Sequence, residues 1–64
     1  MNWDELKEKA EKLKCYYVYS GIGSEWITDG CWTFDEDGIV KLNGDIIAIH
    51  RTPEQMFMIM RGLK

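Results

Sequence analysis

The chain has 64 residues, is 45% hydrophobic and carries a formal net charge of −3. A chain of this length forms one domain with one small core, and a chain this apolar is not intrinsically disordered. The acidic balance argues against a surface that follows nucleic-acid phosphates, because such a surface needs clustered Lys and Arg residues.

The sequence carries no signal for export or for membrane insertion. No stretch approaches the ~18 apolar residues of a membrane span, and the first residues lack the apolar region of a signal peptide. We therefore expect a single domain over residues 1–64 that is soluble, cytoplasmic and without membrane contact. In that compartment Cys15 and Cys31 are expected to be free thiols, and one disulfide between them is the alternative.

A helix is predicted from Asn2 to about Lys14. Asn2 is a favoured N-cap residue, and Glu5 stands three positions later, where its side chain can reach the backbone N–H of the cap. Charged residues of both signs fill the outward positions and predict a solvated face. The apolar residues recur at helical spacing and predict one buried stripe, namely Trp3, Leu6, Ala10 and Leu13.

The next segment is rich in aromatic and β-branched residues. CYYVY, residues 15–19, favours a strand, and SGIG, residues 20–23, indicates a turn or an irregular edge. Three tight-turn signals follow, at Asp29-Gly30, Asp37-Gly38 and Asn43-Gly44. Together these signals predict an antiparallel meander.

The apolar pattern selects a register for the strands of this meander. A turn at residues 35–38 places Phe34 opposite Val40, whereas a slip of one residue would move apolar side chains to the polar face. The next loop, at residues 43–44, then places Val40 opposite Ile47. One sheet face is thus predicted to be buried and to carry Ile27, Trp32, Phe34, Val40, Leu42, Ile47 and Ile49.

The acidic segment TFDEDG, residues 33–38, has two interpretations. Aligned with an EF-hand calcium loop, it leaves Gly44 at the position that requires a bidentate Glu. As a turn, it uses Asp35 to accept backbone N–H groups and Gly38 to supply a positive φ. The turn is favoured, and neither a metal site nor a cofactor is predicted.

A second helix is predicted to begin at TPEQ, residues 52–55. Thr52 as N-cap and Gln55 at the third helical position form a capping box, and Pro53 stands where its missing N–H has no cost. Met58 points away from the apolar side of this helix. The predicted buried stripe consists of Met56, Ile59, Met60 and Leu63, flanked by Phe57.

The predicted fold is an α+β domain with the element order α-β-β-β-β-α. It has an N-terminal helix, a three- to four-stranded antiparallel meander sheet and a C-terminal helix, and both helices are expected on one sheet face. The second face alternates with the buried set and is half apolar. Its residues are Trp26, Thr28, Cys31, Thr33, Ile39, Lys41, Ile46, Ala48 and His50.

This second face is the main candidate for a binding site. A small monomer seldom exposes so much apolar surface, so the face is covered by the N-terminal strand region, paired with a second copy, or bound to another protein. Met58 adds an apolar side chain on the far side of the C-terminal helix. We expect a homodimer or a partner protein, with the contact residues Trp26, Ile39, Ile46 and Met58.

His50 is the single histidine and belongs to two further candidate sites. His50 and Arg51 precede the helix that begins at Thr52, where helix N–H groups would help them to bind an anion. Because Thr52 as a cap occupies those donors, a polar strand end is the favoured interpretation. His50 with Cys15 or Cys31 lacks the spacing of a catalytic nucleophile and base, and no enzyme activity is predicted.

The sequence therefore predicts a small non-catalytic module that binds another protein or a second copy of itself. The alternative is an acidic inhibitor that blocks the basic groove of a nucleic-acid enzyme, with its acidic residues gathered in the turns. The size and acidity of the chain are similar to those of short inhibitor proteins of phages and mobile elements, including anti-CRISPR proteins.

A third hypothesis is a weak binder of single-stranded nucleic acid. Aromatic side chains on a sheet surface can stack bases, but stacking needs a basic groove beside it. The chain offers mainly Lys41, His50 and Arg51 for such a groove, so no direct nucleic-acid binding is expected. The stacking residues of this hypothesis are Tyr16, Tyr17, Tyr19 and Trp26.

Overall fold

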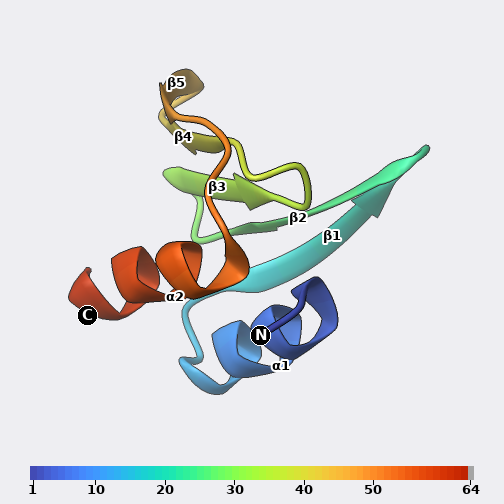
Figure 1. Cartoon of the computed structure of the whole chain (residues 1–64), viewed down its shortest axis with the longest axis vertical. Coiled ribbons are helices and arrows are strands. Elements are labelled where there is room, and N and C mark those ends of the chain that lie inside the picture. The colour runs from blue at the N-terminus through green and yellow to red at the C-terminus, as the bar shows by residue number, and fades with distance from the viewer. Residues whose placement is uncertain (64) are drawn as a thin grey trace.

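The computed structural model describes residues 1–63 and shows two helices and one five-stranded sheet (Figure 1). The elements are α1 (Trp3–Lys12), β1 (Tyr17–Gly21), β2 (Ser24–Thr28), β3 (Trp32–Asp35), β4 (Val40–Leu42), β5 (Asp45–Ala48) and α2 (Pro53–Gly62). Each strand pairs antiparallel with the next, so the sheet order is β1-β2-β3-β4-β5. The predicted α+β meander is confirmed, with one strand more than expected. Within residues 1–63 no helix has the length and apolar character that a bilayer crossing needs.

The first hairpin is longer than the sequence suggested. β1 continues through Gly21, and only Ile22 and Gly23 form the turn. Gly23 has a φ of 79°, in the left-handed region that glycine adopts without steric cost. Residues 17–21 therefore pair along their whole length with residues 24–28, and the hairpin projects beyond the rest of the molecule (Figure 1).

The three predicted tight turns are present. Asn43 and Gly44 have φ values of 52° and 87°, the two left-handed residues of a type I′ hairpin turn. In the turn between β2 and β3, Oδ1 of Asp29 accepts the backbone N–H groups of Cys31 at 3.0 Å and Trp32 at 2.7 Å. Hydrogen bonds and backbone conformations within these turns thus determine where β3 begins and where β4 ends.

The acidic segment between β3 and β4 forms a turn, as predicted. Oδ1 of Asp35 accepts the N–H groups of Asp37 at 2.9 Å and Ile39 at 3.0 Å. Gly38 has a φ of 85° and lies against the connection to α2, where a Cβ on it would be 2.6 Å from the carbonyl oxygen of Arg51. The Arg51 N–H donates to the Gly38 carbonyl at 3.0 Å. Gly38 is therefore needed for its conformation and for this close approach.

Both helices begin with the predicted caps. The Asn2 side chain accepts the N–H of Glu5 at 2.9 Å. The Thr52 hydroxyl accepts the N–H of Gln55 at 3.2 Å, and the Gln55 side chain accepts the N–H of Thr52 at 2.9 Å. This reciprocal pair is the predicted capping box, with Pro53 at the first helical position.

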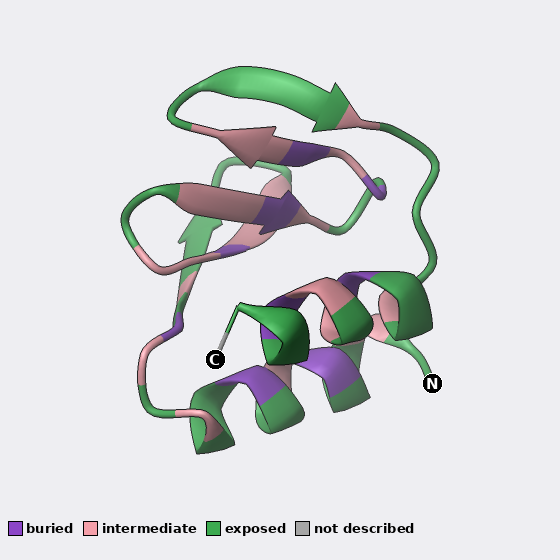
Figure 2. Ribbon diagram, turned by 90° about the vertical axis from the view of Figure 1, so that its left-hand side faces the viewer, coloured by how far each residue is buried: buried purple, intermediate pink, exposed green. Residues whose placement is uncertain are grey.

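Both helices cover one face of the sheet, and the core lies between the two layers (Figure 2). Phe34 is at the centre of this core. Its ring packs edge-on to Tyr16 and parallel to Trp32, with centroids 6.2 Å apart in both pairs. The buried residues are Leu6, Ala10, Tyr16, Ile27, Phe34, Val40, Met56 and Met60.

The C-terminal helix follows the predicted pattern except at its end. Met56 and Met60 are 1% and 0% exposed, and Met58 is 71% exposed on the other side of α2. Leu63, which was predicted to be buried, is 40% exposed. Leu63 is the C-cap residue, beyond the last helical turn, and it does not join the core cluster.

Tyr16 is a core residue, which removes it from the predicted set of exposed stacking aromatics. Lys14 has a φ of 65° and reverses the chain after α1, so that Tyr16 enters the core before β1 begins. The Tyr16 side chain is 2% exposed, and its hydroxyl donates to the carbonyl oxygen of Met60 at 3.5 Å. Burial first, and then the negative charges of Asp29 and Cys15, raise the pKa of Tyr16 to about 12.

This raised pKa predicts a loss of stability at alkaline pH. The unfolded chain releases the Tyr16 proton near pH 10 and the folded chain near pH 12, so the free energy of unfolding should fall as the pH rises through this interval. Urea unfolding of the wild type and of Tyr16→Phe over a pH series measures the effect. The substitution should remove part of the alkaline loss, and an identical loss in both chains would contradict the burial of the hydroxyl.

The last strand pair departs from the predicted register. Val40 opposes Ala48 and not Ile47, because the register shifts between Val40 and Lys41. Between the pairs that Val40 and Lys41 form, β5 has one residue more than β4, which is a β-bulge. The side chains of β5 therefore stop alternating between the two sheet faces at that point. Ala48, predicted on the second face, packs against the core, whereas Ile47 and Ile49, predicted in the core, are 51% and 52% exposed.

Candidate functional site

The sheet face opposite the helices is open within residues 1–63 (Figures 1 and 2). Ile27, Phe34 and Val40 point to the helices, so their neighbours along each strand belong to the open face. Cross-strand pairing arranges that face in two rows. The first row is Tyr17, Thr28, Thr33, Lys41 and Ile46, and the second is Tyr19, Trp26 and Asp35.

The projecting β1–β2 hairpin carries most of the exposed aromatic surface. Tyr17 and Tyr19 are 61% and 49% exposed, and the Tyr19 ring stacks on Trp26 with centroids 6.2 Å apart and an interplanar angle of 21°. Gly21 lies under the indole, where a Cβ would be only 2.9 Å from Trp26. Ile22 at the tip is fully exposed. We call Tyr17, Tyr19, Ile22 and Trp26 the aromatic arm.

A hollow of about 310 Å³ adjoins the aromatic arm on the open face. Its single cation, Lys41, forms no ion pair within residues 1–63. One carboxylate of the hollow, that of Asp35, is held by the backbone of the acidic turn. In the described part of the chain no three His, Cys, Asp or Glu side chains are placed to hold a metal ion. The hollow is lined by Ser24, Trp26, Thr33, Asp35, Asp37 and Lys41.

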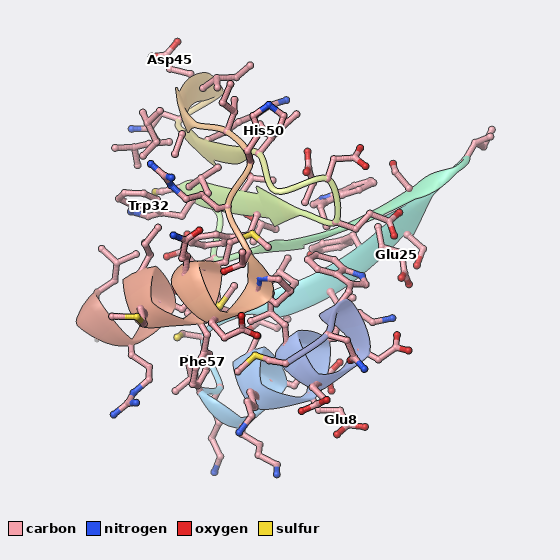
Figure 3. All side chains as sticks on the ribbon, viewed as in Figure 1. Glu8, Glu25, Trp32, Asp45, His50 and Phe57 are labelled. Atoms are coloured by element: carbon pink, nitrogen blue, oxygen red, sulfur yellow. The ribbon has the colours of Figure 1, made fainter. Side chains whose placement is uncertain are left out.

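Glu25 lies in the half of the hairpin next to the turn and ties the arm to α1 on the helix side of the sheet (Figure 3). Its Oε1 accepts from Trp3 Nε1 at 3.1 Å and from Lys7 Nζ at 3.0 Å, and its Oε2 accepts from Ser20 Oγ at 3.2 Å. The Lys7 bond and then the Trp3 bond hold the pKa of Glu25 below its ordinary value. The Glu25 N–H donates to Glu36 at 3.1 Å. The arm therefore has a fixed orientation relative to the helices.

Three of the four predicted contact residues lie on the open face. Trp26 and Ile46 are in its two rows. Ile39 precedes Val40, which points to the core, so by alternation Ile39 belongs to the open face. Met58 is exposed beside Arg61 on α2, which covers the opposite face. One flat partner surface therefore cannot contact all four residues at once.

The assignment of Ile46 to the open face leads to a stability prediction. Ile46 is 60% exposed and opposes Lys41, whereas Ile27 is 0% exposed. Ile46→Lys should leave the chain folded at a cost below about 1 kcal/mol, and Ile27→Lys should unfold it, since an unpaired charge would enter the core. Thermal unfolding of both variants measures the difference. Loss of the fold in Ile46→Lys would place Ile46 in the core.

The predicted anion-binding residues are exposed, but the backbone donors near them are in use. His50 has a φ of 55°, and the N–H of Arg51 donates to a carbonyl of the acidic turn. The capping box occupies the N–H groups of Thr52 and Gln55. Glu54 adds a negative charge to the first turn of α2. An anion at this point would meet the Arg51 guanidinium and the His50 imidazole without support from the cap.

Two exposed residues of β5 and its exit were not anticipated from the sequence. Ile47 and Ile49 were assigned to the core by strict alternation, which the bulge interrupts. A signal for the interruption exists in the run DIIAIH, residues 45–50, where four consecutive apolar residues exceed what a strictly alternating strand contains.

Comparison with known proteins finds no relative of this chain. No family model matches the chain, and no curated protein and no solved structure matches it. Its function must therefore be inferred from its own side chains.

Proposed function

We propose that the protein is a non-catalytic protein-binding module and that the aromatic arm is its contact surface. The supporting observation is the projecting hairpin, with Tyr19 stacked on Trp26 and Ile22 fully exposed at its tip. Tyr and Trp dominate binding hot spots because they bury large areas with few rotatable bonds. A monomer gains no stability from leaving these groups in water.

The rigidity of the arm also supports this role. The bonds from Trp3 and Lys7 to Glu25 tie the hairpin to α1 before any partner arrives, and the bond from Ser20 to Glu25 links its two strands. A preordered surface loses less conformational entropy on binding than a mobile loop does. Association through the arm therefore needs little rearrangement of the chain.

The test is a capture experiment with matched variants. The immobilised chain is exposed to an extract of its native cells, and the retained proteins are identified by mass spectrometry. Tyr17→Glu and Ile22→Asp should each abolish retention of the partner, because both place a charge in the apolar contact. Met58→Glu changes a similarly exposed side chain on α2 and should retain the partner. Equal retention by every chain, or no retained protein, would contradict the proposal.

A second candidate is the acidic inhibitor of a nucleic-acid enzyme. It is supported by the carboxylates of Asp35, Glu36 and Asp37, which lie at the end of the open face near the arm. A partner of this kind would present a basic surface to the acidic turn. Capture of a basic enzyme that is released by moderate salt would favour this candidate, because salt screens exposed charge pairs.

Direct binding of single-stranded nucleic acid is expected to be absent at physiological salt. The arm offers rings for base stacking, but Lys41 is the one basic residue in the two rows of the open face, and Asp35 stands in the same rows. Stacking without a basic groove gives weak binding. Fluorescence anisotropy with labelled strands over a salt series measures it. Tight binding that weakens steeply with salt would replace the protein-binding proposal.

A further inference from the structure

A second exposed apolar surface lies at the other edge of the sheet. Ile46, Ile47 and Ile49 are 60%, 51% and 52% exposed. They belong to β5 and its exit, and the outer edge of β5 has no neighbouring strand among residues 1–63. An edge strand presents unpaired N–H and C=O groups, and proteins usually protect such an edge with charged side chains. Here three isoleucines occupy the edge instead.

Charges of opposite sign stand at the two ends of this apolar edge. Asp45 begins β5, and His50 and Arg51 follow its exit. All three side chains are exposed, and Figure 3 shows Asp45 and His50 at the end of the molecule away from the helices. Neither Asp45 nor Arg51 forms an ion pair within residues 1–63. The edge therefore runs from a negative end to a positive end.

We propose that β5 pairs antiparallel with β5 of a second copy, so that two sheets join at this edge. In antiparallel pairing the start of one strand faces the end of the other, so Asp45 of each copy lies opposite Ala48 of its partner, next to the exit of β5 that carries His50 and Arg51. The isoleucines of the two copies then meet each other. Because the pair has a two-fold axis, the charge contact forms twice. Parallel pairing would instead set Asp45 against Asp45.

The pairing surface is small and lies apart from the aromatic arm. Three isoleucines are a minor part of the about 800 Å² per partner that a stable interface buries, so the dimer is weak and concentration-dependent. β5 and β1 are the two opposite edges of the sheet, so a dimer joined at β5 would present two arms. The inference therefore does not depend on the function proposed for the arm.

A charge-exchange experiment tests this geometry. Sedimentation velocity from about 1 µM to 1 mM, the span of weak association constants, should show the wild type passing from monomer to dimer. Asp45→Lys and Arg51→Glu should each stay monomeric, because both charge contacts become repulsive. An equimolar mixture of the two variants should dimerise again, since each introduced charge then faces its opposite in the other chain. Antiparallel pairing of this edge predicts both a wild-type dimer and recovery on mixing, whereas parallel pairing would set like charges against each other in the wild type.

Controls separate loss of pairing from loss of folding. Each variant is first checked by thermal unfolding, and Ile47→Lys, which alters the apolar contact alone, should also be monomeric. If a charge variant does not fold, amide hydrogen exchange of the wild type decides the question, because exchange at Ile46 to Ile49 should slow as the concentration rises. A wild type that is monomeric at the highest concentration overturns the proposal. So do a mixture that stays monomeric and a wild type whose exchange does not change.

Discussion

Replacing Gly38 by alanine is expected to destabilise the fold by roughly 2–5 kcal/mol. A non-glycine residue with positive φ costs about 1–2 kcal/mol, and forcing atoms into a filled space costs about 1–3 kcal/mol more. Both costs apply here, because Gly38 has a φ of 85° and a Cβ would be 2.6 Å and 2.8 Å from backbone atoms of Arg51. A chain of this size has a total stability of roughly 3–10 kcal/mol, so much of it would be lost.

Gly30 provides the matched control. It has a φ of 101°, but a Cβ on it would have no atom within 4 Å. Gly30→Ala should therefore show only the conformational cost of about 1–2 kcal/mol. Urea unfolding of both variants measures the two free energies, and their difference isolates the close approach to Arg51. Equal losses would mean that the acidic turn does not contact the connection to α2.

Replacing Phe34 by alanine is expected to cost about 3–5 kcal/mol, which approaches the total stability of the chain. Phe34 is 0% exposed, lies on the central strand, and contacts the rings of Tyr16 and Trp32. Because protein interiors are close-packed, the removed ring would leave a cavity between the sheet and the helices. Near-ultraviolet circular dichroism and urea unfolding should show a chain without fixed tertiary packing.

Phe34→Leu is the control for this prediction. Leucine keeps most of the apolar volume, so the cost should stay below about 1.5 kcal/mol and unfolding should remain cooperative. A cooperative transition with a small loss in Phe34→Ala would show that Phe34 is not the centre of the core.

The features that the sequence predicted correctly are set by neighbouring residues. The Asn2 and Thr52 caps and the turns that end in glycine each depend on a few consecutive side chains and on local backbone conformation. The register of β3 against β4 followed from the period of two in an alternating strand. The same alternation correctly placed Trp26 and Ile46 on the open face.

The features that the sequence did not reveal depend on distant contacts. Tyr16 is buried because the chain reverses at Lys14 and meets α2, and no local pattern separates it from the exposed tyrosines beside it. The bulge in β5 lies just before the segment in which Arg51 bonds to Gly38 across the fold. Alternation cannot be extended through a bulge, so a strict period of two places Ile47 and Ile49 in the core, and the apolar run at residues 46–49 is the one local sign of the interruption.

The simple order of the sheet also has a consequence for how the chain folds. Every strand pairs with its neighbour in sequence, so each hairpin can form by closing a short loop, and the relative contact order of the sheet is low. The two helices, by contrast, stand at opposite ends of the chain and pack against each other. We therefore expect the docking of α1 onto α2 to be the slow step of folding, because it alone must bring together segments separated by the entire meander.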